Sequence, residues 1–224
     1  MYLIYSALLA ASLLVSLPYW LLQRLRHGKY RFGLGERLGR VPPRLLGQKK
    51  RPTIWVHAVS VGEVVAISGL VAELNQQLAE HRIVVSTTTD TGQKLARTRF
   101  GEENVFYFPL DFAFAIRPYL RSLQPELVVI AETEFWPNFL RLAHACGAQI
   151  VVANARISDG SRAGYRRFRY WLGKILRKVD LFLTQTEEDA RRLQEIGAPG
   201  ERRPSRADQD ADFAYRGRER AGVV

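Results

Sequence analysis

The sequence is nearly devoid of cysteine, since Cys146 is the only one among 224 residues. A single cysteine excludes an intramolecular disulfide and fits a reducing compartment. The four histidines show no paired spacing typical of metal ligands: His27, His57, His81 and His144. We therefore predict no structural zinc, and we expect Cys146 to be a small buried apolar residue.

Common nucleotide and nucleophile motifs are also absent. The segment VSVGEV lacks the G-x-G-x-x-G spacing of dinucleotide sites, and G-x-x-x-x-G-K-[ST] occurs nowhere. Without a G-x-S-x-G elbow, Ser60 is a weak candidate for a nucleophile. NAD-dependent, P-loop and serine-hydrolase chemistries thus lose their best sequence support.

Side-chain charge is missing from the first 22 residues. Residues 2–22 form an uncharged apolar run with tyrosine and tryptophan near its ends, which is long enough for a helix to cross a bilayer. No basic segment precedes this run and no small-x-small cleavage site follows it, so a cleaved signal peptide is disfavoured. The sequence predicts a transmembrane anchor at residues 1–22.

The net charge of +11 is concentrated after this run. Residues 23–50 hold nine Lys or Arg against one acid, Glu36, which predicts that this side is cytoplasmic. Topology needs few of these charges, so Arg31, Arg37, Arg40 and Arg44 are left to contact anionic head groups or an anionic lipid. A membrane anchor makes nucleic acid a less favoured partner.

From Pro52 onward, short apolar runs alternate with longer helical patterns. We predict strands at 53–58, 83–87, 105–108, 127–131, 149–153 and 181–184. Helices are predicted at 62–80, 91–100, 112–123, 136–146, 159–178 and 187–196. This alternation is typical of an α/β fold with a parallel, doubly wound sheet, whose ligands bind beyond the carboxyl ends of the strands.

Acids are frequent in the loops that follow the predicted strands. Five of these six loops contain one: VSVGE, STTTDTG, PLD, ETEFWPN and TQTEED, with NARIS as the exception. Helix capping explains the hydroxyl residues in these loops. It does not explain Glu132 and Glu134, which flank Thr133 beside Phe135 and Trp136.

Glu63 lies at the junction of the first strand and its helix, and two roles remain open for it. A carboxylate in the first turn of a helix is stabilised by the helix dipole, so capping alone would explain its position. A general base is the alternative, but the dipole lowers the pKa of a carboxyl group and weakens it as a base. That role therefore requires burial or a neighbouring acid, for which Glu132 is the candidate.

Ordered motifs over residues 1 to about 200 resemble one known family. They are the apolar anchor, KYRFGLGERLGR, VHAVSVGE, STTTDTG, FPLD, ETEFWPN and NARISDGS. In this order and spacing they are similar to the transferases of 3-deoxy-D-manno-octulosonic acid (Kdo), in their N-terminal half.

The resemblance implies a two-domain GT-B glycosyltransferase of lipopolysaccharide synthesis at the cytoplasmic face of the inner membrane, working without metal or cofactor. It would transfer Kdo from CMP-Kdo to a lipid A precursor (lipid IVA) with inversion at the anomeric carbon. The base of the family falls on Glu63, and its transition-state-stabilising acid falls on Glu132. The other candidate residues would bind the acceptor or shape the cleft: Ser60, Gly62, Glu134, Trp136, Arg156, Ser158, Arg31 and Arg37. The segment from Arg156 to Lys178 contains eight Lys or Arg and could hold lipid phosphates.

The resemblance ends near residue 200. Residues 201–224 contain six Arg and five acids without Leu or Ile, a composition that favours disorder. The family would continue into a second, nucleotide-binding domain, so we interpret the tail as non-native, after a frameshift or premature stop near Glu201. The expected organisation is an anchor (1–22), a basic segment (23–50), a Rossmann-like acceptor domain (51–200) and a tail (201–224), with the second GT-B domain missing.

Two other functions stay open at this point. One is a non-catalytic membrane-bound module that binds anionic lipid through its basic segments. The other is a membrane-tethered nucleotide-binding protein of another class, which would bind nucleotide without preference for CMP.

Overall fold

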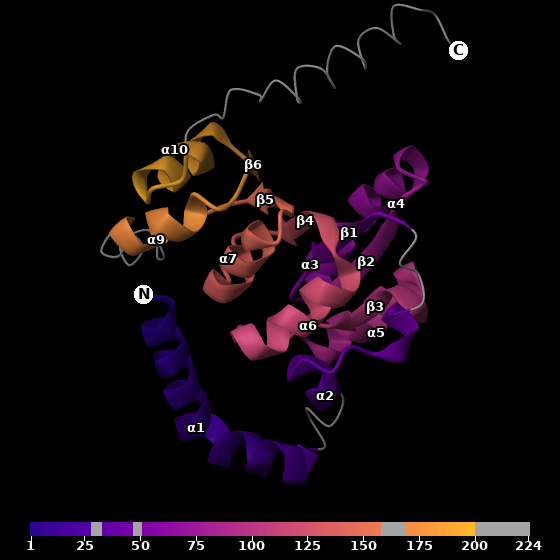
Figure 1. The fold of residues 1–224 in the computed structure, drawn as a ribbon, viewed down its shortest axis with the longest axis vertical. Coiled ribbons are helices and arrows are strands. Elements are labelled where there is room, and N and C mark those ends of the chain that lie inside the picture. Colours follow the sequence, from indigo (N-terminus) through magenta and orange to yellow (C-terminus); the bar gives the residue numbers. More distant parts are fainter. Residues whose placement is uncertain (28–32, 47–50, 158–168, 200–224) are drawn as a thin grey trace, which may run out of the picture.

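A computed structural model describes residues 1–27, 33–46, 51–157 and 169–199 (Figure 1). Six strands form one sheet in the order β3-β2-β1-β4-β5-β6, and every neighbouring pair is parallel. The strands are β1 (Thr53–His57), β2 (Arg82–Thr87), β3 (Val105–Tyr107), β4 (Pro125–Ala131), β5 (Gln149–Ala155) and β6 (Leu181–Thr184). The predicted parallel, doubly wound sheet is confirmed.

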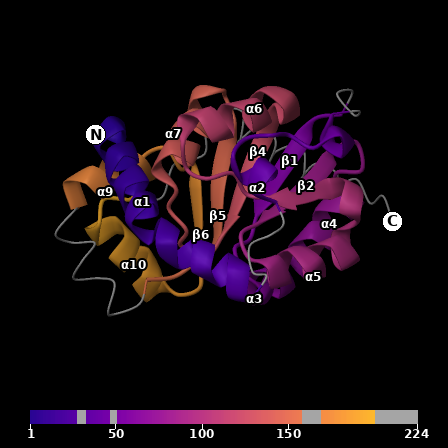
Figure 2. The ribbon, with the colours of Figure 1, turned by 90° about the horizontal axis from the view of Figure 1, so that it is seen from below.

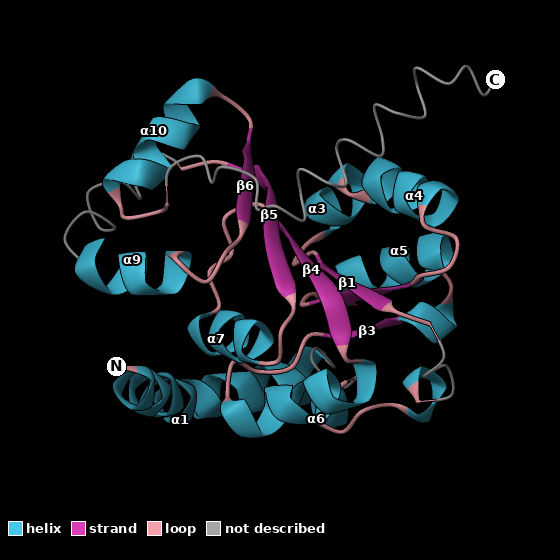
Figure 3. Ribbon diagram, turned by 45° about the horizontal axis from the view of Figure 1, so that its top comes forward, coloured by secondary structure: helices cyan, strands magenta, loops and turns pink. Residues whose placement is uncertain are grey.

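Helices cover both faces of this sheet (Figure 3). One face packs against α3 (Val61–Ala66), α4 (Ser68–Gln77) and α5 (Asp90–Phe100). The other packs against α6 (Ala113–Leu123), α7 (Pro137–Ala145), α9 (Arg169–Leu176) and α10 (Glu187–Glu195). Burial on both faces is why the central strands are almost continuously apolar.

Trp55 lies at the centre of the larger core. Its side chain is fully buried, and its ring centroid lies 4.8 Å from that of Phe139 and 5.2 Å from that of Phe106. Its neighbours on β1, Ile54 and Val56, point to the opposite face and belong to the second core. Both faces of β1 are therefore committed to packing, and only the end of the strand is free to reach a ligand.

The helix predicted at 62–80 is two helices, because α3 ends at Ala66 and α4 begins at Ser68. The hydroxyl of Ser68 donates to the carbonyl of Val64 at 2.6 Å. Such bonds from serine to the preceding turn bend helices, which accounts for the break. The short α3 carries Glu63 and directs it independently of α4.

Residues 33–46 pack along the outer strand β3. They contain α2 (Leu34–Arg37) and a 3-10 turn (Pro43–Leu45), and a second 3-10 turn (Glu102–Asn104) lies beside them. The carboxylate of Glu36 accepts the backbone N–H of Tyr107 at 2.7 Å and pairs with Arg44 at 2.8 Å. Gly33 has φ 78°, and a Cβ there would lie 2.0 Å from the Tyr107 ring, so this position requires glycine. The GLGER motif thus attaches this segment to the sheet.

Two arginines expected to face lipid are instead bound within the domain. Arg44 donates to the carbonyls of Glu102 and Val105. Arg37 donates to the carbonyl of Thr88, and its guanidinium lies 4.5 Å from the centroid of the Tyr107 ring. Arg37 and Arg44 therefore make hydrogen bonds within the domain, and the contact of residues 31–44 with anionic lipid stays a prediction.

The apolar N-terminal run forms α1 (Tyr2–His27). Within the described part of the chain, no helix combines the length and apolarity needed to cross a membrane. The transmembrane anchor predicted at residues 1–22 is thus not supported.

The N-terminal end of α1 lies near α7 and α9 (Figure 2), and its side chains make polar contacts with the domain. Tyr5 is hydrogen-bonded to the buried carboxylate of Asp111, and the amide of Asn138 donates to the Ser6 hydroxyl at 3.0 Å. The Arg141 guanidinium lies 4.6 Å from the centroid of the Tyr2 ring. These contacts join the start of α1 to α7, while Leu3, Leu8, Leu14 and Val15 remain exposed.

Cys146 is exposed, so the expectation that it is buried is wrong. It follows α7 as the C-cap, at the edge of the sheet where the strands begin. There it lines a surface cavity of about 470 Å³ rather than the core.

Candidate functional site

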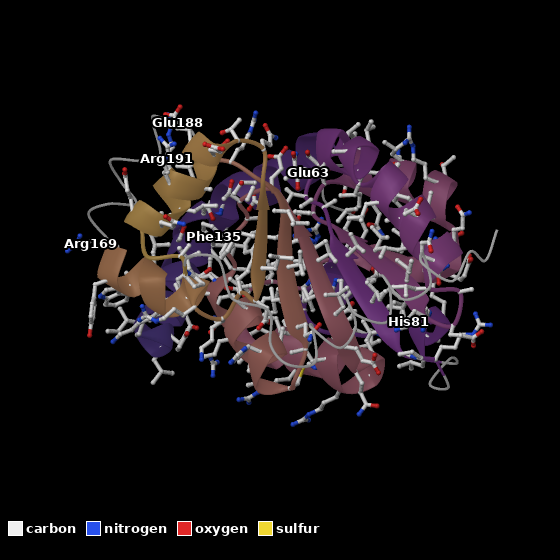
Figure 4. All side chains as sticks on the ribbon, turned by 90° about the horizontal axis from the view of Figure 1, so that it is seen from above. Glu63, His81, Phe135, Arg169, Glu188 and Arg191 are labelled. Carbon is white, nitrogen blue, oxygen red and sulfur yellow. The ribbon has the colours of Figure 1, made fainter. Side chains whose placement is uncertain are left out.

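The carboxyl ends of the parallel strands place three acids near one another: Glu63, Glu132 and Glu134. Glu63 follows β1, and the other two follow the neighbouring strand β4. The charges of Glu63 and Glu132 both act on the carboxyl group of Glu134. Figure 4 shows Glu63 at one end of the strands and His81, which precedes β2, towards the other.

Glu63 is held in a defined orientation at the start of α3. One carboxylate oxygen accepts the backbone N–H of Val59 at 2.8 Å, and the other accepts the Ser60 hydroxyl at 3.0 Å. Ser60 is the N-cap, and its Oγ also accepts the backbone N–H of Glu63. The Glu63 residue is 7% exposed. The hydrogen bonds at the helix start therefore fix the orientation of the Glu63 side chain, while the surroundings set its pKa.

Those surroundings raise the pKa of the Glu63 carboxyl group above its ordinary value. Burial is the largest cause, and the charge of Glu132 adds to it. The hydrogen bonds from Val59 and Ser60 act in the opposite direction but do not cancel the effect. Both conditions that a base at this helix start requires, burial and a neighbouring acid, are thus met.

The loop after β4 holds the second and third acids. Glu132 has φ 58°, a left-handed conformation that is uncommon for a residue with a side chain. Its backbone N–H donates to the carbonyl of Ala153, and the Thr133 hydroxyl donates to the carbonyl of Arg156. Burial, together with the charges of Glu63 and Glu132, raises the pKa of Glu134. This loop is strained in the manner that often accompanies function.

Aromatic rings cluster where the same strands end. Trp136 ends the loop as the N-cap of α7, and its ring centroid lies 5.5 Å from Phe108 and 6.3 Å from His57. His57 ends β1 and stacks on Phe108 with a centroid distance of 3.9 Å. These rings form one aromatic cluster beside the loop that carries Glu132 and Glu134.

The other candidate residues are placed as follows. Gly62 is exposed, and a Cβ there would meet only the Ser60 hydroxyl at 3.9 Å, so the backbone does not require glycine. The Arg156 side chain is exposed beside the loop. The Arg37 side chain is 15% exposed and bound inside the domain. Arg31 and Ser158 lie outside the described residues.

Sequence reasoning noted the FPLD segment but missed the role of Asp111. This carboxylate is 1% exposed and accepts the backbone N–H groups of Asn138 at 3.0 Å and Phe139 at 2.8 Å. It therefore caps α7 from a different strand end and fixes the helix that begins beside Trp136. A proline directly before Asn138 marks a helix start, but only the tertiary structure supplies its cap.

The basic residues before β6 lie away from the acids. Lys174, Arg177 and Lys178 line a cavity of about 390 Å³ with Met1 and Tyr2. This group precedes β6, so it lies at the edge where strands begin, opposite the edge that carries Glu63. Residues 174–178 thus lie apart from Glu63, and the role of this basic segment in holding lipid phosphates stays a prediction.

The structure is a Rossmann-like α/β domain with three interacting acids at the carboxyl ends of its strands. A family model described as "3-Deoxy-D-manno-octulosonic-acid transferase (kdotransferase)" matches residues 33–205. The chain belongs to this family of Kdo transferases.

Curated relatives bear the name 3-deoxy-D-manno-octulosonic acid transferase. The one from Chlamydophila psittaci is 32% identical over 201 residues, which cover 89% of this chain and 46% of the relative. The Haemophilus influenzae protein is 31% identical over 202 residues, with coverages of 88% and 46%. The Bordetella pertussis protein is 33% identical over 204 residues, with coverages of 86% and 46%. The chain thus spans about half the length of these relatives.

Proposed function

We propose that this chain is the acceptor-binding half of a glycosyltransferase that transfers Kdo from CMP-Kdo to a lipid A precursor in lipopolysaccharide synthesis. The observation that carries the proposal is the Glu63 carboxylate, which is buried, oriented by Val59 and Ser60, and raised in pKa beside Glu132. A base with a raised pKa retains affinity for the proton that it must remove from a hydroxyl group.

The proposed steps use groups of this chain as follows. Glu63 removes the proton from the acceptor hydroxyl, whose oxygen then attacks the anomeric carbon of Kdo. The bond to CMP breaks on the opposite face, so the configuration inverts. Glu132 stabilises the positive charge that develops on the sugar, and Glu134 keeps the local field negative.

A lipid acceptor is supported by apolar side chains near the same edge of the sheet. Leu34 and Leu38 are each 47% exposed, and Phe114 at the start of α6 is 60% exposed. The segments that carry them touch, since a Cβ on Gly39 would lie 2.8 Å from the backbone of Ala115. We infer that this surface faces acyl chains at the cytoplasmic side of the inner membrane, and that Arg156, exposed after β5, contacts anionic groups.

The test uses a chimera that joins residues 1–199 to the second half of the Bordetella pertussis relative. We expect it to transfer Kdo from CMP-Kdo to lipid IVA, measured by mass spectrometry of the lipid. Glu63→Gln should lower kcat by about 10²–10⁴-fold, because the amide keeps the hydrogen bond from Val59 but cannot accept a proton. The control, Glu73→Gln, changes an exposed acid of α4 and should leave kcat unchanged. Equal rates for the two variants would contradict the role of Glu63.

A further inference from the structure

The proposed reaction assigns no role to His57, although its ring nitrogens can donate and accept hydrogen bonds. The residue is fully buried at the end of β1, and its ring stacks on Phe108. Burial lowers the pKa of the imidazole to about 3, so the ring is neutral at physiological pH and carries one N–H.

The neighbouring hydrogen bonds decide which nitrogen carries that proton. The indole N–H of Trp55, which can only donate, is bonded to the Ser86 hydroxyl at 2.8 Å. That hydroxyl retains its own proton and lies 2.9 Å from Nδ1 of His57. The backbone carbonyl of Ser86 accepts the N–H of Ala58 and lies 3.2 Å from Nδ1 of His57, farther than the hydroxyl does. The arrangement that satisfies the indole N–H, the hydroxyl proton and Nδ1 together runs from Trp55 through Ser86 to Nδ1, and it leaves the imidazole proton on Nε2.

Two buried N–H donors then lie in one aromatic cluster. Nε2 of His57 and Nε1 of Trp136 are both inaccessible to solvent, and neither has a partner among the described residues. The two rings are 6.3 Å apart at 69°, and both contact Phe108. An unsatisfied buried donor costs ~1–3 kcal/mol, so two neighbouring donors of this kind indicate a shared acceptor.

We propose that the Nε2–H of His57 and the Nε1–H of Trp136 bind one internal water molecule, which ties the end of β1 to the loop of residues 132–136. His57 is then a positioning residue that holds Glu132 and Glu134 in register with Glu63. This last consequence rests on the proposed function, whereas the bound water does not.

A water molecule fits this position better than a substrate atom does. Both donor nitrogens lack solvent-accessible surface and their rings contact Phe108 in the core, so a sugar cannot reach them without opening the core. A water oxygen can accept both N–H groups at once, as ordered internal waters commonly do.

The first experiment is NMR of the ¹⁵N-labelled 224-residue chain. We expect His57 in the neutral Nε2–H form down to about pH 4, with a cross-peak between Nε2–H and a long-lived water. Trp136→Phe, which retains a ring, should shift the Nε2–H resonance and remove that cross-peak. Trp171→Phe, an exposed ring of α9, should change neither. A proton on Nδ1, or the absence of the water cross-peak in the unaltered chain, would overturn the proposal.

A second experiment measures positioning in the chimera. His57→Phe keeps the stacking but loses the donor, and we expect about a tenfold fall in kcat and an acid limb of the pH profile displaced to lower pH, as Glu63 loses its ordered neighbours. His57→Gln supplies an amide N–H near the position of Nε2 and should restore most of kcat. Identical losses in the two variants would contradict the positioning role. A chimera without any transferase activity would count against the proposed function and leave the NMR result to decide on the water.

Discussion

At the residue scale, the helix-start contacts of Glu63 are compatible with the role of catalytic base that we propose for it. Its carboxylate completes the N-terminal turn of α3 by accepting from Val59 and Ser60. The same two bonds fix its direction, while burial and Glu132 keep its pKa high. The capping role therefore orients the base and does not compete with it.

The raised pKa has a defined consequence for pH dependence. Glu63 acts as a base only when ionised, so activity of the chimera should fall as pH decreases through its raised pKa, at a higher pH than for an ordinary glutamate. Glu132→Gln removes a charge that raises this pKa and should displace the acid limb to lower pH. The measurement is kcat/KM against pH, and an unmoved limb in Glu132→Gln would show that the two carboxylates do not interact.

The raised pKa of Glu63 also predicts that a rise in pH lowers the stability of the fold, whereas it raises the activity. A carboxyl group whose pKa is higher folded than unfolded stabilises the fold when protonated, and this contribution is lost as pH rises through the folded value. At neutral pH, Glu63→Gln should therefore raise Tm or leave it unchanged while it abolishes turnover. Thermal unfolding at pH 7 and at pH 4 tests this, because the difference between the two proteins should shrink at the lower pH.

At the element scale, α7 depends on a cap from another strand. Asp111 binds the first two N–H groups of this helix and also Tyr5 of α1. Asp111→Ala should lower the free energy of unfolding by about 3 kcal/mol, because a cap is worth ~0.5–2 kcal/mol and buried donors are left unsatisfied. Urea unfolding measures the loss, and Glu80→Ala, at an exposed acid, should cost little. Equal costs would show that the cap contributes nothing.

The segment of residues 33–46 is attached to β3 mainly through the side chain of Glu36. The Glu36 side chain is 15% exposed and binds both Arg44 and the backbone of Tyr107. Glu36→Ala should cost about 2 kcal/mol, because it removes the carboxylate that neutralises the partly buried Arg44 and leaves the N–H of Tyr107 without its acceptor. Glu36→Gln retains an acceptor and should cost less. Limited proteolysis should then cleave near residues 33–46 sooner in the alanine variant than in the glutamine variant.

At the scale of the whole molecule, the chain spans about half the length of its curated relatives. The proposed function makes this chain the acceptor-binding half, so we expect the 224 residues by themselves to bind the lipid A precursor but to show little or no Kdo transfer. Lipid binding measured by fluorescence and transfer measured by mass spectrometry test the two halves of this statement. Transfer by the chain alone, abolished in Glu63→Gln, would contradict the expected lack of transfer while supporting the proposed role of Glu63 as the base.

The sequence by itself determined the order of strands and helices and the position of Glu63 at a strand end. Alternating apolar runs specify these features locally, so all six strands were predicted within a few residues. Tertiary structure decided what depends on groups distant in sequence: the burial and neighbouring charges that raise the pKa of Glu63, the cap that Asp111 gives to α7, and the internal contacts of Arg37 and Arg44. It also decided that α1 docks on α7 through Tyr5 and Ser6, because hydrogen-bond partners more than 100 residues away leave no periodic signal in the chain.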